Sequence, residues 1–302
     1  MMLQVLDKDE HLSKIQISDV TDNQFSICVD ICCRIILEEE FGLAKDYSMD
    51  IGPCQNVDVV KSVIEIQDSL INCLKAIDSS IRYIISYNGQ NRYFKHCSES
   101  FYEFAVYHYY VACHRVSTVK DLYFKLINEI YDLGVEKCNW KTIKKNREKI
   151  CNPNLFEILN ENQALISTIE NVRNSATHEG KLQLPISSDS YSFLKCSDFK
   201  AEHPECGLSD EFSRQSDKYE EVIFNVKKEL LDTMSLIRYN VFAATKCFFC
   251  SLSIDFLKLI KDRMPHIWRQ IEEDYKMNCN NESCDIFNSP TKGKDYDLER
   301  GN

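Results

Sequence analysis

Residues that break helices are scarce in this chain, and this scarcity constrains its fold more than any other feature. Eight glycines and six prolines make up 14 of the 302 residues, whereas average usage of the two is roughly 12%. Sandwiches, barrels and doubly wound sheets need a turn every few residues, and turns use both residue types. Hydrophobic residues make up 44% of the chain, which is enough for a packed core and excludes a disordered chain. The composition therefore predicts long helices joined by few loops.

Apolar residues recur at three- and four-residue steps in six segments, which is typical of amphipathic helices. The predicted helices cover residues 22–41, 57–88, 97–133, 139–149, 153–179 and 212–276. Gly134 and Gly180 follow two of these segments, where glycine commonly ends a helix. Residues 181–211 are rich in Ser and Asp and contain two prolines, so we expect a long connection there, with room for a short hairpin. Residues 279–302 are polar and predict a disordered tail.

No point in the sequence separates two independent cores. We therefore expect one all-helical domain over residues 1–278. Its central part covers about residues 57–180, the long connection follows at 181–211, and the C-terminal helices occupy 212–276. The whole would be a helical bundle with flanking helices.

Charge and hydropathy limit where the protein can act in the cell and what it can bind. The net charge of −11 argues against a protein that coats nucleic acid by bulk charge, although it leaves room for a local basic groove. The most hydrophobic window, residues 241–260, contains Lys246, Asp255 and Lys258, so it predicts a buried helix rather than a membrane span. The sequence opens without a basic stretch followed by an apolar one, the pattern of a secretory signal. We expect a cytoplasmic protein that makes no membrane contact.

Fifteen cysteines, an odd number, indicate free thiols rather than a disulfide framework. Several lie in apolar helical pattern, where thiols pack as small hydrophobic groups: Cys28, Cys32, Cys33, Cys73, Cys113 and Cys247. Cys247 and Cys250 have the CxxC spacing of a metal site, but two phenylalanines lie between them and predict core packing. Cys196, His203 and Cys206 have ligand spacing without a clear fourth ligand, and Cys279 with Cys284 forms only a loose pair. We expect no metal and no cofactor, while a metal-binding regulator stays open as a third hypothesis.

The end of the segment 153–179 carries the most informative polar residues. It reads STIENVRNSATHEG and contains Arg173, Asn174 and His178. A guanidinium offers a fork of donors to phosphate oxygens, and an imidazole can accept or donate a proton near neutral pH. These groups suit a phosphodiester substrate, and no metal is required when the nucleophile is the substrate's own 2′-hydroxyl. No glycine-rich phosphate loop, GxSxG elbow or HExxH segment is present, which disfavours other common hydrolases.

Helix geometry then suggests an oligomer. Positions five apart on a regular helix differ by about 140° in direction and about 7.5 Å in height. Arg173 and His178 of one chain therefore do not point the same way. Two such helices packed about a two-fold axis would let the groups converge, so we expect a homodimer with its cleft at the interface. The negative end of the helix dipole would favour the protonated imidazole of His178.

The residues Arg173-Asn174-x-x-x-His178 resemble the R-x(4–6)-H motif of the HEPN superfamily. The segment SFYEFAVYHYYVACHRVSTVKDLYFKLINEIYDLG at 100–134, followed by NWKTIKKN, is similar to the long second helix of one prokaryotic HEPN branch. The resemblance covers roughly residues 97–180. It implies an up-and-down helical bundle and, for many members, metal-independent ribonuclease activity in toxin–antitoxin, phage-defence and RNA-processing systems.

The resemblance also implies roles for the three residues. Arg173 would bind and polarise the scissile phosphate, His178 would be the general base or acid, and Asn174 would orient the site. The product would be a 2′,3′-cyclic phosphate, and an antitoxin or accessory protein would be a further partner. The superfamily also holds members that bind without cutting, so a non-catalytic module binding RNA, a nucleotide or a protein is the alternative.

Two further clusters are candidates for RNA contact. The run 137–149 holds six basic residues and one acidic residue, and it could follow an RNA backbone through Lys141, Lys144 and Lys145. Trp140 would offer a base-stacking face there. In the segment 97–133, the substrate-contact candidates are His108, Tyr110, His114 and Arg115. Two of them, His108 and Arg115, continue an apolar stripe and would therefore need partners or a cleft.

Overall fold

The computed structural model describes residues 15–40, 57–87, 101–179, 184–194 and 219–272, with the exception of 266 and 270. All regular secondary structure in this part of the chain is helical, which confirms the predicted all-α class. The helices are α3 (Ile17–Thr21), α4 (Gln24–Glu40), α5 (Val57–Ser86), α7 (Phe101–Ile130), α8 (Trp140–Lys145), α9 (Arg147–Ile150), α10 (Pro153–Glu179) and α13 (Tyr219–Arg263), and a short helix covers residues 188–194. Among these helices, none combines the length and the apolar character that a bilayer span requires.

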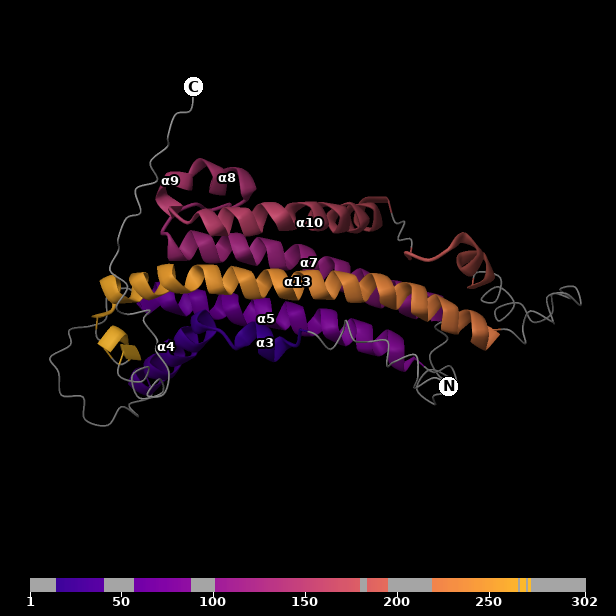
Figure 1. The fold of residues 1–302 in the computed structure, drawn as a ribbon, viewed down its shortest axis with the longest axis horizontal. Helices are drawn as coiled ribbons and strands as arrows, with labels where there is room; N and C mark the ends of the chain where they lie inside the picture. The colour runs from indigo at the N-terminus through magenta and orange to yellow at the C-terminus, as the bar shows by residue number, and fades with distance from the viewer. Residues whose placement is uncertain are drawn as a thin grey trace, which may run out of the picture.

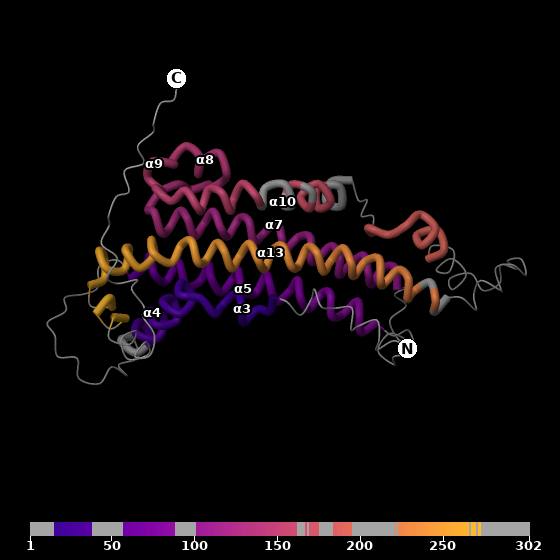
Figure 2. The backbone as a smooth tube through the Cα atoms, in the orientation of Figure 1, coloured from indigo at the N-terminus to yellow at the C-terminus, as the bar shows by residue number. Residues whose placement is uncertain are grey.

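Four long helices, α5, α7, α10 and α13, form an up-and-down bundle (Figure 1 and Figure 2). Contacts between α7 and α13 advance in the same direction along both helices, since Tyr123 meets Thr245 and Tyr131 meets Asp255. These two helices are therefore parallel. α5 and α10 run the opposite way, and each packs against both α7 and α13. The short helices α8 and α9 lie beside the beginning of α10, and α3 and α4 cover α5 and α13.

Aromatic side chains fill the core between these layers. Phe25 of α4 lies against Phe249 and Phe256 of α13, with ring centroids 5.0 and 5.1 Å apart. Tyr123 of α7 stacks on Phe248 of α13 at 4.1 Å. All five rings are at most 1% exposed, so one continuous apolar core joins α4, α7 and α13. Burial of this size is the main source of folding free energy in a bundle.

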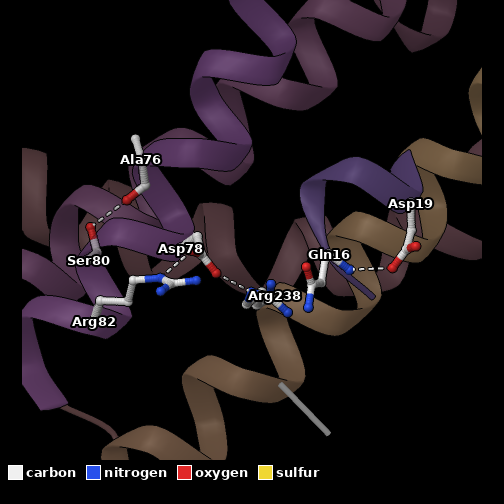
Figure 3. Close-up of polar contacts among 7 residues, drawn as sticks. All are labelled: Gln16, Asp19, Ala76, Asp78, Ser80, Arg82 and Arg238. Atoms are coloured by element: carbon white, nitrogen blue, oxygen red, sulfur yellow. Dashed lines mark hydrogen bonds and ion pairs between the residues drawn. The ribbon is translucent and has the colours of Figure 1, made fainter. Parts of the chain in front are cut away.

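Two buried cations tie α13 to α5. Arg238 of α13 donates from Nε to Asp78 Oδ1 at 2.7 Å, and the other carboxylate oxygen of Asp78 accepts from Arg82 Nε at 2.7 Å (Figure 3). Lys227 Nζ donates to the backbone carbonyls of Ile85 and Tyr87, at 3.3 and 2.5 Å. These carbonyls belong to the end of α5, where a helix leaves acceptors without intrahelical donors. Burial lowers the pKa of the Lys227 ammonium.

Polar residues set the start of α4 and interrupt one helix that the apolar pattern predicted as continuous. The predicted helix 22–41 corresponds to α4, which begins at Gln24 because the Asn23 side chain accepts from Ser26 N at 3.0 Å. The preceding short helix α3 was not predicted. α3 itself begins with a reciprocal cap, in which Gln16 N donates to Asp19 Oδ2 at 2.7 Å (Figure 3). The predicted helix 139–149 divides at Asn146, whose φ of −99° and ψ of 21° lie outside helical values. Periodicity alone does not reveal such breaks, because the apolar spacing continues across them.

The C-terminal boundaries also differ from the prediction. The predicted helix 212–276 is described from Tyr219, and α13 ends at Arg263. The described residues 265, 267–269 and 271–272 are helical again, so the predicted helix is broken at Met264 rather than ended there. Pro265 explains this break, since the residue before a proline avoids the helical region. Within the predicted connection 181–211, residues 188–194 form a helix whose flanking Leu184 and Leu194 are 5% and 1% exposed, and no hairpin occurs in the described stretch 184–194. Gly180, the rest of that connection and the predicted tail 279–302 lie outside the described residues.

Candidate functional site

The start of α10 is attached firmly to the bundle. Asn152 precedes the helix, and its Oδ1 accepts from Leu155 N at 3.1 Å, as an N-cap does. Its amide nitrogen donates to Ser251 O at 3.0 Å and to Asp255 Oδ2 at 2.6 Å. The hydroxyl of Tyr131, just after α7, donates to the same carboxylate oxygen at 2.5 Å. This polar cluster holds α7, α10 and α13 together at one end of the bundle.

An ion pair sets the register of α10 on α7. Lys120 of α7 binds Glu170 of α10, and both side chains are largely buried, with exposures of 17% and 26%. Arg173 lies one turn beyond Glu170 and next to the buried Ile169, so it stands at the border between the packed face and the surface. Its side chain is partly buried, whereas Asn174 is exposed. The four-residue step from the buried Ile169 accounts for this border position.

His178 belongs to the last turn of α10, while its side chain lies outside the described part of the chain. On the regular helix that the backbone forms, residues 173 and 178 differ in direction by about 140° and in height by about 7.5 Å. The geometry of one protomer therefore does not aim Arg173 and the position of His178 at one point.

Four of the predicted contact residues lie on α7 toward this end of the bundle. Because α7 and α10 are antiparallel and Lys120 meets Glu170, Arg173 is level with about residue 117 of α7, and position 178 with about residue 112. His114 and Arg115 fall within that interval, and Tyr110 lies less than one turn beyond it. The rings of Tyr110 and His114 lie 6.1 Å apart. The structure therefore brings these α7 residues to the level of Arg173.

Arg115 and His108 face α5 rather than α10. Arg115 is exposed and lies beside Cys73 of α5, where burial raises the pKa of the thiol and the guanidinium acts in the opposite direction. His108 packs between Tyr83 of α5 and Tyr107, with ring centroids 5.0 and 5.1 Å away. Burial lowers the pKa of the His108 imidazole, so the ring is neutral at physiological pH. His108 therefore has the partners that its place on the apolar stripe predicted, whereas Arg115 is exposed and does not continue the buried face.

Tyr83 is a residue that the sequence did not single out. It is 54% exposed and Tyr107 is 62% exposed, so two large aromatic side chains stand open to solvent on either side of His108. Exposed aromatic rings of this kind can stack on bases. Tyr83 lies far from His108 in sequence, and only the pairing of α5 with α7 brings the two together.

The basic run lies at the other end of α10. Arg147 of α9 lies over Phe156, at 5.3 Å from its centroid, and Trp140 of α8 lies 6.3 Å from the same ring. Seventeen residues separate Phe156 from Arg173, which corresponds to about 25 Å along the helix. The structure therefore does not bring Lys141 and its neighbours to the level of Arg173 (Figure 1).

Trp140 does not present the open stacking face that the sequence suggested. Its ring packs against Phe124 and Phe156, with centroid distances of 6.5 and 6.3 Å, and the ammonium of Lys144 lies 4.8 Å above it. Ile143, on the same short helix, is fully buried. Trp140 therefore anchors α8 to α7 and α10, because a large ring gains more from this burial than from a solvated position.

The expectation for the CxxC pair was wrong. Cys247 and Cys250 are exposed, and the two phenylalanines between them are the buried residues of this turn. Helical periodicity explains this, since positions 248 and 249 both face the core and leave 247 and 250 at its edges. Cys196, His203, Cys206, Cys279 and Cys284 lie outside the described residues. Among the residues that the structure does describe, no three potential metal ligands come together.

Comparison with models of known protein families shows which family the chain belongs to. Residues 58–236, more than half of the chain, match the model of the HEPN_Cthe2314-like HEPN family. The chain belongs to the HEPN superfamily. The matched HEPN region begins with α5, includes α7 to α10 with Arg173 and His178, and ends within α13. Comparisons with curated proteins and with solved structures gave no match.

Proposed function

We propose that this HEPN protein is a metal-independent endoribonuclease of toxin or defence type. The observation that carries the proposal is the Arg173-x4-His178 spacing within the family-matched region, on a helix that leaves Arg173 partly exposed and Asn174 exposed. A guanidinium at the surface border is accessible to a phosphate and held by the packing of its own helix. Tyr110 and His114, which lie on α7 near the level of Arg173, would contact the flanking nucleotides.

The proposed reaction is a transesterification within the RNA strand. His178 accepts the proton of the 2′-hydroxyl, and the 2′-oxygen attacks the adjacent phosphorus. A 2′-O–P bond forms and the P–O5′ bond breaks, and the departing 5′-oxygen takes a proton from the imidazolium. Arg173 neutralises the charge that develops on the phosphate oxygens, and Asn174 orients the site. The products are a 2′,3′-cyclic phosphate and a 5′-hydroxyl.

The site is completed by a second copy of the chain. Within one α10, Arg173 and position 178 diverge by about 140°, so one helix does not aim both groups at the same phosphate. Two α10 ends related by a two-fold axis bring Arg173 of one protomer to His178 of the other. The protein acts in the cytoplasm, where an antitoxin or accessory protein would restrain it.

Cleavage of mixed RNA in the presence of EDTA tests this function directly. The wild-type protein should cut, and Arg173→Ala and His178→Ala should each reduce the rate by about 100-fold or more. Arg34→Ala, which removes an exposed arginine on α4, serves as the matched control and should cleave normally. Cleavage that needs a divalent cation, or that persists in either motif variant, would contradict the proposal. RNA binding without any cleavage would instead support the non-catalytic module.

The rate should also depend on pH as an imidazole does. Because His178 must accept one proton and donate another, the rate should change slope near the pKa of histidine, about 6.5. A rate that stays flat between about pH 5 and 8 would argue against proton transfer by His178. Induced expression should arrest growth for the wild type and not for Arg173→Ala, which tests the toxin or defence role.

A further inference from the structure

The α8–α9 region is the most concentrated positive charge in the described chain. Residues 137–149, which we call the basic corner, carry six basic residues and one acidic residue in a protein of net charge −11. Lys141, Lys144, Lys145 and Arg147 are all exposed. None of these four forms an ion pair with a carboxylate of the described residues. Their charge is therefore available to a polyanion.

The basic corner is held rigidly on the bundle. Asn139 caps α8 by accepting from Thr142 N at 3.1 Å, and Ile143 and Ile150 are buried at 0% and 1% exposure. Trp140 is packed against α7 and α10, as described above. Such anchoring lowers the entropy that a bound ligand would otherwise have to remove.

The covered face of Trp140 defines what the basic corner can recognise. With that partly buried ring packed against Phe124, Phe156 and the Lys144 ammonium, the exposed groups of the basic corner are mainly cations. Cations contact phosphates without regard to base sequence. The surface therefore fits a sugar-phosphate backbone, and its contacts should not depend on base identity.

We propose that the basic corner binds the backbone of the RNA substrate at a second point, about 25 Å from Arg173 along α10. This inference rests on the proposed ribonuclease function for the identity of the polyanion. A duplex that rises roughly 3 Å per base pair covers this distance in about eight pairs. The protein therefore favours RNAs long enough to reach both points, and very short oligonucleotides contact only the region of Arg173.

The test compares two triple variants of the full-length protein. Lys141→Gln/Lys144→Gln/Lys145→Gln neutralises the basic corner. Lys228→Gln/Lys246→Gln/Lys258→Gln removes the same charge from exposed positions on α13 and is the matched control. The probe is a single-stranded RNA of about 30 nucleotides with 2′-O-methyl groups, which cannot be cleaved by 2′-hydroxyl attack. Far-UV circular dichroism verifies that both variants are folded.

We expect the corner variant to bind this RNA at least tenfold more weakly in about 0.1 M salt, and the control variant to bind within twofold of wild type. The slope of log Kd against the logarithm of the salt concentration should decrease by about 2 in the corner variant. Three phosphate contacts are lost, and each contact to a single strand contributes about 0.7 to this slope. The loss should be equal for uridine and adenosine homopolymers. Equal binding by the two triple variants would overturn the inference and assign the corner to another partner, such as an acidic protein.

Cleavage of an unmodified trinucleotide separates this inference from the proposed function. All three proteins should cut the trinucleotide at the same rate, because it is too short to reach the basic corner. If wild type cuts no RNA but the corner variant still binds the long RNA more weakly, the ribonuclease proposal fails and the backbone contact stands. If wild type cuts the trinucleotide and the two triple variants bind alike, the backbone contact fails and the ribonuclease proposal stands.

Discussion

Replacing Asp78 by alanine would remove the carboxylate that links α5 to α13. The Arg238 side chain is only 4% exposed and that of Asp78 14%, so the 2.7 Å pair between them is shielded from water. Removing one partner of a buried pair costs about 3–5 kcal/mol, because the remaining charge stays desolvated. The Arg238 guanidinium also lies 4.4 Å from the centroid of Phe242, which keeps part of its stabilisation. We therefore expect Asp78→Ala to lower the free energy of unfolding by about 3 kcal/mol.

Arg82→Ala is the matched control for this variant. Its guanidinium contacts the other oxygen of the same carboxylate at 2.7 Å, but its side chain is 77% exposed. An exposed pair one turn apart on a helix contributes about 0.5 kcal/mol or less. Urea unfolding followed by circular dichroism should therefore separate the two variants, with a midpoint shift of about 1 M for Asp78→Ala if the m-value is near 3 kcal/mol/M.

The double replacement Asp78→Leu with Arg238→Met tests whether the desolvated charge of Arg238 causes the loss of stability. If the cost arises because the buried Arg238 guanidinium loses the Asp78 carboxylate, the double variant should recover most of the stability that Asp78→Ala loses. Equal unfolding free energies for Asp78→Ala and Arg82→Ala would refute the reasoning. So would a double variant that is less stable than Asp78→Ala.

Three further predictions concern titratable side chains. Iodoacetamide should modify the exposed Cys250 in the native protein and the buried Cys113 only after unfolding, as peptide mass spectrometry would detect; equal rates would contradict the burial pattern. Burial raises the pKa of the Cys28 thiol to about 12, so the unfolding free energy should fall as pH rises above about 8.5, where the unfolded thiol ionises. Urea midpoints between about pH 7.5 and 10 should show a shallower fall for Cys28→Val, and unchanged slopes would be the contrary result. Because burial lowers the pKa of His108, stability should fall as pH drops below about 6.5, where the unfolded imidazole binds a proton. His108→Phe should weaken this acid dependence in thermal unfolding scans while keeping the contact with Tyr83.

Helical pattern predicted the interior of the fold well and its interruptions poorly. The predicted helices 57–88 and 153–179 correspond to α5 and α10, because their apolar spacing is long and regular. The start of α4 at Asn23 and the break at Asn146 arise from backbone and side-chain polar geometry, which leaves the apolar spacing unchanged. A proline is visible in sequence, yet the break in the helix before Pro265 was missed, because the apolar pattern continues beyond it.

In the candidate site, too, features within one helix were predictable and contacts between helices were not. The border position of Arg173 follows from its four-residue step after the buried Ile169, a relation that one helix alone determines. The long-range contacts were not predictable, since Tyr83 reaches His108 only through the packing of α5 on α7. The covered ring of Trp140 and the exposed thiols of Cys247 and Cys250 depend on which side of a helix faces its neighbours. One sequence does not determine that choice when apolar residues surround the position.

The pair between Lys120 and Glu170 makes α10 intolerant of small changes in length. Deleting one residue between Glu170 and Arg173 would turn the guanidinium by about 100° and draw it about 1.5 Å toward the start of the helix. Because the start of α10 is held at Asn152 and its middle at Glu170, the helix has no free end before Arg173 that could absorb such a shift. Insertions and deletions among homologous chains should therefore fall outside this helix, or come in groups of about seven residues that restore its phase.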